Sequence, residues 1–249
     1  MEAEEQKMKK YSMKQRIVTM VNAAIFLGFL GLTLSMFFES KKTGLDWAML
    51  LICLGIFACA LYYEYLKYLY NDALYTLNFL LNPQSAEEKY KNLCKLDITH
   101  NYEKNTGIFE VMISIEKNDP VKALELIKKN EKRFRSNVEL LIIMYYYQIR
   151  AYLLLGNAKK VNEVYSDALV IRKMKKRPNI INYHELDGLH ELALGNKKKA
   201  CDYFKQVDGS KMNPKEILFI YSQLAELTAG EERAEYQRRI AQLKGVANP

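Results

Sequence analysis

The sequence predicts an all-α protein in which an N-terminal transmembrane helical hairpin precedes a solenoid of helical hairpins. Two long apolar runs without a charged residue lie close to the start of the chain. The remainder has helical periodicity, with Pro and Gly mainly between the periodic segments and no clear strand alternation. These observations divide the chain into a basic tail (1–16), a two-helix hairpin (17–63), an amphipathic connecting helix (64–82) and a helical repeat domain (83–249).

The two apolar runs have the lengths of membrane spans. At a rise of about 1.5 Å per residue, a helix over residues 17–38 spans about 33 Å and one over residues 47–63 about 26 Å. The hydrocarbon core of a bilayer is about 30 Å thick, and spans within it must be helical because lipid offers backbone groups no partner. The charged linker 39–46 separates the runs. A buried core helix or a cleaved signal peptide fits less well, because the first run is too long and a second follows directly.

Basic residues near the spans predict the orientation of the hairpin. These residues are Lys7, Lys9, Lys10, Lys14 and Arg16 before the first span, Lys41 and Lys42 in the linker, and Lys67 after the second span. Because basic residues concentrate on the cytoplasmic side of a membrane, we expect an integral membrane protein whose two termini and repeat domain are cytoplasmic.

Small residues in the first span predict close helix packing. They are Ala24, Gly28, Gly31 and Ser35, which form two small-xxx-small pairs. Such pairs let helix backbones approach each other in lipid. Two partners for this face remain open, namely the second span of the same chain and the first span of a second copy in a homodimer.

The segment after the second span continues without a helix breaker and is amphipathic. Its apolar stripe includes Leu66, Leu69, Ala73 and Leu77. We expect one helix of about 35 residues that begins in the second span and ends at Asn82-Pro83. The stripe has two interpretations: it lies along the membrane surface, or it packs under the domain that follows.

Residues 83–249 read as successive helices joined by short turns. Helices are predicted near 85–96, 100–117, 120–133, 137–155, 158–174, 180–194, 197–206, 214–228 and 231–243. The turns at Asn118-Asp119, Gly156-Asn157 and Gly195-Asn196 make this a series of helical hairpins.

The hairpins share a sequence pattern. Residues 156–161 (GNAKKV) align with residues 195–200 (GNKKKA), and an aromatic residue follows four positions later, at Tyr165 and Phe204. This pattern resembles the tetratricopeptide repeat, whose second helix carries a small residue and then an aromatic residue at these offsets. Gly188 matches the glycine of the family's first helix.

The resemblance covers roughly residues 100–243 and its motifs are degenerate. The key small positions are Ala123, Val161, Ala200 and Ala234, at intervals of 38, 39 and 34 residues. The family period is about 34 residues, so two copies carry insertions. The family's closing proline is absent or displaced to Pro178 and Pro214, which leaves a generic helical-hairpin solenoid as the alternative.

The resemblance implies a non-catalytic adaptor or scaffold that binds a protein or peptide partner in a groove lined by the first helices. Carried over by the register above, the partner-binding positions are Ile108, Met112, Tyr146, Arg150, Glu185, Leu189, Phe219 and Gln223. Three of them, Ile108, Met112 and Leu189, are equally well explained as core. The alternative function is a membrane-associated regulator or sensor whose repeat domain binds a ligand or its own amphipathic segment.

No pattern in the sequence predicts an enzyme, a cofactor site or a metal site. His184 and His190 lie six residues apart in HELDGLHE, whereas a zinc-protease helix needs histidines four apart. We expect the polar residues of this helix to be solvated, with one or two packed histidines. The four cysteines have neither a disulfide framework nor metal-ligand spacing.

The net charge of +8 includes two basic clusters. The first contains Arg172, Lys173, Lys175, Lys176 and Arg177, and the second is Lys197–Lys199. A solvated helix end explains such clusters, and contact with anionic lipid is the main functional alternative. Nucleic acid is disfavoured, since no nucleic-acid-binding motif accompanies the charge.

Overall fold

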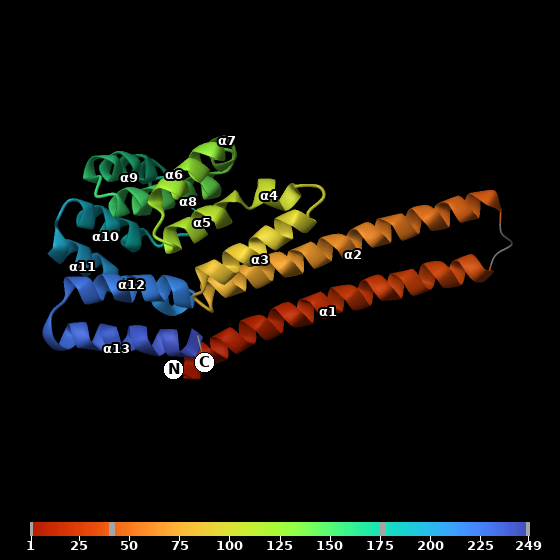
Figure 1. The fold of residues 1–249 in the computed structure, drawn as a ribbon, viewed down its shortest axis with the longest axis horizontal. Helices are drawn as coiled ribbons and strands as arrows, with labels where there is room; N and C mark the ends of the chain where they lie inside the picture. Colours follow the sequence, from red (N-terminus) through yellow and green to blue (C-terminus); the bar gives the residue numbers. More distant parts are fainter. Residues whose placement is uncertain (1, 40–42, 175–177, 248–249) are drawn as a thin grey trace.

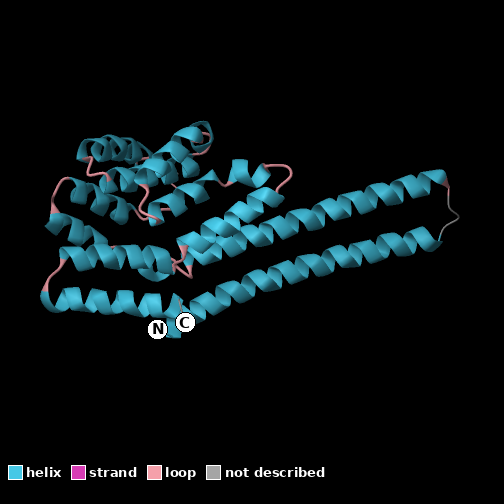
Figure 2. Cartoon of the chain, viewed as in Figure 1, coloured by secondary structure: helices cyan, strands magenta, loops and turns pink. Residues whose placement is uncertain are grey.

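A computed structural model describes residues 2–39, 43–174 and 178–247, and every regular element in these ranges is helical (Figures 1 and 2). The predicted all-α class is therefore confirmed. In chain order the elements are α1 (Glu2–Glu39), α2 (Gly44–Asn78), α3 (Pro83–Leu96), α4 (Asn101–Asn105), α5 (Gly107–Glu116), α6 (Pro120–Lys129), α7 (Glu131–Phe134), α8 (Val138–Leu154), α9 (Ala158–Arg172), α10 (Tyr183–Ala193), α11 (Lys197–Lys205), the 3₁₀ helix η1 (Gly209–Lys211), α12 (Pro214–Leu227) and α13 (Gly230–Ala247).

Three of the helix–helix turns use the same local chemistry. Asn118, Gly156 and Gly195 have positive φ angles of 58°, 67° and 79°, the left-handed conformation that stops a helix. An Asp or Asn follows each of them and serves as the N-cap of the next helix. The side chains of Asp119 and Asn157 each accept a hydrogen bond from a backbone N–H three residues on. The predicted turns are therefore present and join antiparallel helices.

The second half of the chain is built from the pairs α5–α6, α8–α9, α10–α11 and α12–α13, each packed side by side (Figure 1). In α10–α11 the helices approach closely at Gly188, where a Cβ atom would lie 2.9 Å from the Phe204 ring. Ala123, Val161 and Ala200 are fully buried, as their predicted role requires.

The fourth predicted copy has a different register. Ala234 is exposed, unlike the other three key small positions, so its place in the predicted register is wrong. Residues Tyr236, Ile240 and Leu243 of α13 are the less exposed ones instead, and Tyr236 packs against Tyr221 of α12 at 5.8 Å between ring centroids. Their spacing of four and three residues places them on the one helical stripe that faces α12.

Two predicted helices are each divided in two. The segment 100–117 breaks at Thr106 (φ −118°, ψ 22°), whose hydroxyl donates to the Tyr102 carbonyl at 2.7 Å. The segment 120–133 breaks at Asn130, whose side chain lies within about 3 Å of where a Cβ on Gly107 would be. The Thr106 hydroxyl also lies 2.8 Å from the Tyr90 hydroxyl of α3, so both breaks lie at contacts between segments, which the helical periodicity does not contain.

Helices α1 and α2 form a long extension that runs away from the other helices (Figure 1). Residues 17–38 lie inside α1, and α2 contains residues 47–63 and continues to Asn78, as the single long helix predicts. Aromatic pairs join them: Phe26–Phe57 with ring centroids 6.1 Å apart, and Phe37–Trp47 at 4.8 Å.

The small residues of the first span do not face α2. Ala24, Gly28, Gly31 and Ser35 are exposed, and a Cβ atom on either glycine would meet nothing within 4 Å. The prediction that these residues pack against the second span is therefore wrong. Bulkier side chains such as Phe26 and Phe37 occupy the contact with α2 instead. The homodimer stays a prediction.

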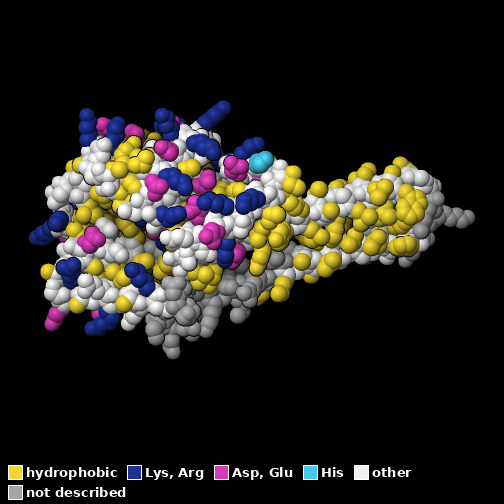
Figure 3. Space-filling model, in the orientation of Figure 1, with side chains coloured by type: hydrophobic (Ala, Val, Ile, Leu, Met, Phe, Trp, Pro, Cys, Tyr) yellow, Lys and Arg dark blue, Asp and Glu magenta, His cyan; other side chains and the backbone are white. Residues whose placement is uncertain are grey.

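Among the described residues, α2 is the helix with the length and apolar composition of a membrane span. Its most apolar 18-residue window has a mean hydropathy of 2.1, and large apolar side chains there, such as Leu51, Ile52 and Ile56, are exposed. The apolar part of α1, Met20–Ser35, is shorter than a membrane span of this kind, so the first predicted span stays a prediction. Figure 3 shows hydrophobic side chains covering the extension, whereas charged side chains gather over the helical body.

The last third of α2 belongs to the helical body. Leu66, Ala73 and Leu77 are fully or almost fully buried, and they pack with residues of α3 and α5 such as Leu93 and Phe109. Of the two interpretations of the amphipathic stripe, packing under the following domain is the one that the structure has. A second core, formed by α5–α13, adjoins this one at Met112.

Candidate partner-binding cavity

A cavity of about 560 Å³ lies among α5, α8, α10 and α12 and the segment 179–182. Six of the eight predicted partner-binding residues line it: Ile108, Met112, Tyr146, Arg150, Glu185 and Phe219. The other two do not. Leu189 is fully buried in the core, and Gln223 is half-buried outside the lining.

Helical spacing explains which residues meet. On α5 and α8 the lining residues are four positions apart, at 108 and 112 and at 146 and 150, so each pair lies on one helix face. Helices α10 and α12 contribute Glu185 and Phe219, but not the residues four positions later. The cavity therefore extends along one face of α5 and one of α8, whereas Leu189 packs into the main core.

Glu185 is a buried carboxyl on the cavity wall. It is 4% exposed, and its Oε1 accepts a hydrogen bond from the Tyr146 hydroxyl. Burial raises the pKa of Glu185 to about 7, although the Tyr146 hydrogen bond and the charge of Arg150 act in the opposite direction. Burial and the adjacent Glu185 also raise the pKa of Tyr146. Near neutral pH the cavity thus holds a carboxyl that gains or loses a proton readily.

Arg150 is one of three cations that line the cavity. It is 8% exposed, and its Nη1 lies 3.2 Å from Glu116 Oε1. Its guanidinium carbon lies 4.1 Å from the centroid of the Phe219 ring, in cation–π geometry. Burial alone would lower the pKa of Arg150, but the charges around it, Tyr146 and Glu116 first among them, raise it above its ordinary value. Arg150 therefore stays charged.

A second buried ion pair lies beside the cavity on α10. Asp187, which is 4% exposed, accepts hydrogen bonds from Arg172 Nη1 at 2.7 and 2.9 Å and from the Tyr165 hydroxyl at 2.7 Å. The expectation that the polar residues of this helix are solvated is wrong for Glu185 and Asp187, because neighbouring helices supply their hydrogen-bond partners.

The residues of the two basic clusters differ in their surroundings. Arg172 pairs inside the fold, whereas Lys173 and Lys197–Lys199 are exposed. Lys175, Lys176 and Arg177 lie outside the described residues.

Four further features of the cavity were not predicted. Glu116 pairs with Arg150 and also lies 3.9 Å from Nζ of Lys215, which is only 6% exposed. His184 lines the cavity, and its buried Nδ1 has no hydrogen-bond partner among the described residues. Ile180, 45% exposed, forms part of the rim. Of these, only Ile180 could have been noticed in the sequence, because Ile180-Ile181 is an apolar pair in a polar loop. The charged residues gave no such indication, since charged side chains are exposed in most proteins.

The lining combines apolar walls with three cations, Arg150, Arg172 and Lys215, and three carboxyls, Glu185, Asp208 and Glu216. Such a surface suits an amphipathic segment, with apolar side chains for the walls and a polar group for Arg150 or Glu185.

Within the described residues no group of His, Cys, Asp and Glu is arranged to hold a metal ion. Comparison of the chain with protein-family models, with curated proteins and with solved structures finds no match.

Proposed function

We propose that this protein is a membrane-anchored, non-catalytic adaptor that binds a peptide or helix of a partner protein in the cavity among α5, α8, α10 and α12. The single observation that carries the proposal is the convergence of Tyr146, Arg150, Glu185 and Phe219 on one cavity. A tetratricopeptide-like register selects these positions without reference to the tertiary structure. Tyr and Arg are also the residue types that contribute most to binding at protein interfaces.

Two observations support anchoring through the α1–α2 hairpin. The apolar part of α2 is exposed, and a soluble chain would lose free energy by leaving such a surface in water. Helix α1 begins close to α13, so the residues on both sides of the hairpin lie at the same end of it (Figure 1). That arrangement suits a hairpin that enters and leaves the membrane from the cytoplasmic side, where the helical body would meet its partner.

The self-binding alternative has less support. The stripe with Leu66, Ala73 and Leu77 packs on α3 and α5, and no described residue of α2 lines the cavity. The cavity therefore stays accessible to a partner while the stripe is in place.

The test uses the rim of the cavity, because Tyr146 and Arg150 are buried and their replacement by alanine would also disturb the fold. A photo-crosslinking residue at Ile180 in the full chain should capture one discrete partner segment in native membranes. A synthetic peptide of that segment should bind the purified full chain in detergent. Ile180→Lys should weaken this binding at least about tenfold, which corresponds to about 1.4 kcal/mol.

Val170 provides the matched control. It is 64% exposed on α9 and does not line the cavity. Val170→Lys should leave the affinity unchanged, and a crosslinker there should not capture the same segment. Equal effects of the two substitutions, with unchanged melting temperatures, would exclude this cavity as the binding site.

A further inference from the structure

The turn between α3 and α4 exposes two apolar side chains. Ile98 is 82% exposed and Leu96 is 46% exposed. Single exposed apolar residues are common on soluble proteins, so their exposure alone has no functional meaning. Their position relative to α2 does have a functional meaning.

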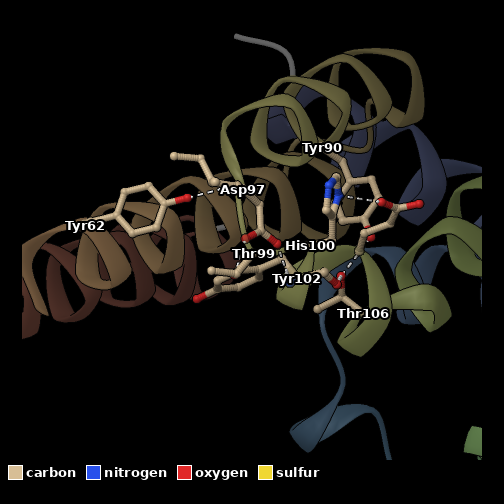
Figure 4. Close-up of polar contacts among 9 residues, drawn as sticks. Tyr62, Tyr90, Asp97, Thr99, His100, Tyr102 and Thr106 are labelled. Atoms are coloured by element: carbon tan, nitrogen blue, oxygen red, sulfur yellow. Dashed lines mark hydrogen bonds and ion pairs between the residues drawn. The ribbon is translucent and has the colours of Figure 1, made fainter. Parts of the chain in front are cut away.

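Tyr62 of α2 attaches this turn to the hairpin. Its hydroxyl donates a hydrogen bond to the Leu96 carbonyl at 2.8 Å and accepts one from the Ile98 N–H at 2.9 Å (Figure 4). One side chain at the end of the apolar part of α2 thus holds the backbone on both sides of Asp97.

The turn is also held by its own hydrogen bonds. Asp97 is 1% exposed and accepts from the Thr99 hydroxyl at 2.7 Å and from the Tyr102 N–H at 2.6 Å (Figure 4). His100 adopts the left-handed conformation with φ 52°. Ile98 therefore points outward from an ordered turn whose polar groups are satisfied internally.

The level of Tyr62 along α2 matches a membrane boundary. From Asp46 to Glu64, the charged residues on either side of the apolar run, the helix rises about 27 Å, close to the thickness of about 30 Å of a hydrocarbon core. The first charged residue after this run, Glu64, comes two positions after Tyr62 and accepts a hydrogen bond from Asn22 at 3.2 Å. Exposed Tyr63 and Tyr65 flank it, and tyrosine is enriched where acyl chains meet headgroups.

We propose that the α3–α4 turn inserts Leu96 and Ile98 into the boundary between headgroups and acyl chains of the leaflet from which α2 emerges. This inference rests on the proposed membrane anchoring. Tyr62 holds the turn beside the end of the apolar part of α2, and the exposed Lys95 at the end of α3 lies next to the turn, where it would meet lipid phosphates. A third point of contact, beside α1 and α2, fixes the rotation of the helical body about the α2 axis.

Tryptophan fluorescence tests this contact, because Trp47 is the only tryptophan in the chain. The full chain is reconstituted in phosphatidylcholine vesicles in which part of the lipid carries bromines near the glycerol end of the acyl chains. Three proteins are compared: the wild type, and two reporters in a Trp47→Phe background, Ile98→Trp and Val170→Trp. The expected result is quenching by brominated lipid for Trp47 and for the Ile98→Trp reporter, with a blue-shifted emission and loss of quenching by aqueous acrylamide.

The reporters separate the two proposals. Quenching of Trp47 without quenching of the Ile98→Trp reporter would overturn the turn contact and leave the anchoring intact. Absence of lipid quenching at both positions would overturn the anchoring and the contact together. Lipid quenching of the Val170→Trp reporter as well would overturn a contact specific to this turn.

A further variant tests the attachment of the turn. Tyr62→Phe removes both hydrogen bonds to the turn and should reduce lipid quenching of the Ile98→Trp reporter while Trp47 in the otherwise wild-type chain remains quenched. Unchanged quenching of the Ile98→Trp reporter would overturn the role of Tyr62 in holding the turn at this depth.

Discussion

At the scale of single residues, Glu185 couples the cavity to pH. Its pKa in the folded chain, about 7, is above its ordinary value of 4.5. The folded state therefore favours the protonated form, and the stability this gives is fully present below about pH 4.5 and is lost as the pH rises through about 7. The full effect is on the order of 3 kcal/mol.

Glu185→Gln should remove this pH dependence, because the amide oxygen can still accept the Tyr146 hydrogen bond without carrying a charge. The variant should match the wild type near pH 4.5 and exceed its melting temperature at pH 8, measured on the full chain in detergent. Glu231→Gln, at an exposed position on α13, serves as the control and should leave the profile unchanged. Parallel profiles for wild type and Glu185→Gln would contradict the assigned surroundings of this carboxyl.

Ala200 tests the packing within one helical hairpin. It is fully buried on α11, so a larger side chain must displace its neighbours, at a cost of about 1–3 kcal/mol. Ala200→Leu should therefore lower the melting temperature more than Lys198→Leu, which changes an exposed position on the same helix. If both variants melt alike, Ala200 is not at the contact between the two helices.

At the scale of helices, the last third of α2 is part of the helical body, so the body begins earlier in the chain than predicted. Sequence periodicity places the repeat domain at 83–249 and treats 64–82 as a connecting segment. Because Leu66 and Leu77 are buried against α3 and α5, a fragment that starts at residue 83 loses about 1.5–3 kcal/mol for each of these side chains. It also exposes the apolar face of α3.

A fragment of residues 64–249 should accordingly be helical and monomeric and should melt cooperatively. A fragment of residues 83–249 should melt at a lower temperature and tend to aggregate. Circular dichroism and size-exclusion chromatography measure both properties. Equal melting temperatures would mean that α2 contributes little to the stability of the body.

Local signals explain which elements could be predicted. The turns at Asn118, Gly156 and Gly195 follow from residues that tolerate positive φ, and six lining residues of the cavity follow from the positions that the tetratricopeptide resemblance implies. The breaks at Thr106 and Asn130 could not be predicted, because they depend on contacts between segments. Glu116 and Lys215 were missed for a related reason: a charged residue in a helix is usually solvated, and its burial depends on a partner supplied by another helix.

At the scale of the whole molecule, the hairpin geometry makes a prediction about topology. The start of α2 and the helical body lie at opposite ends of the long extension (Figure 1). If the extension spans the membrane, Thr43 and the body must lie on different sides of it. The basic residues before the first span predict a cytoplasmic body.

Thiol labelling of intact cells with a membrane-impermeant reagent measures this arrangement. Thr43→Cys should be labelled in intact cells, whereas Lys198→Cys should react only after the cells are permeabilised. Lys198 is the suitable reporter for the body because it is exposed, while the native Cys201 is 8% exposed and would escape the reagent on either side of the membrane. Labelling of Lys198→Cys alone in intact cells would reverse the orientation, and equal labelling of both positions would mean that the extension does not cross the membrane.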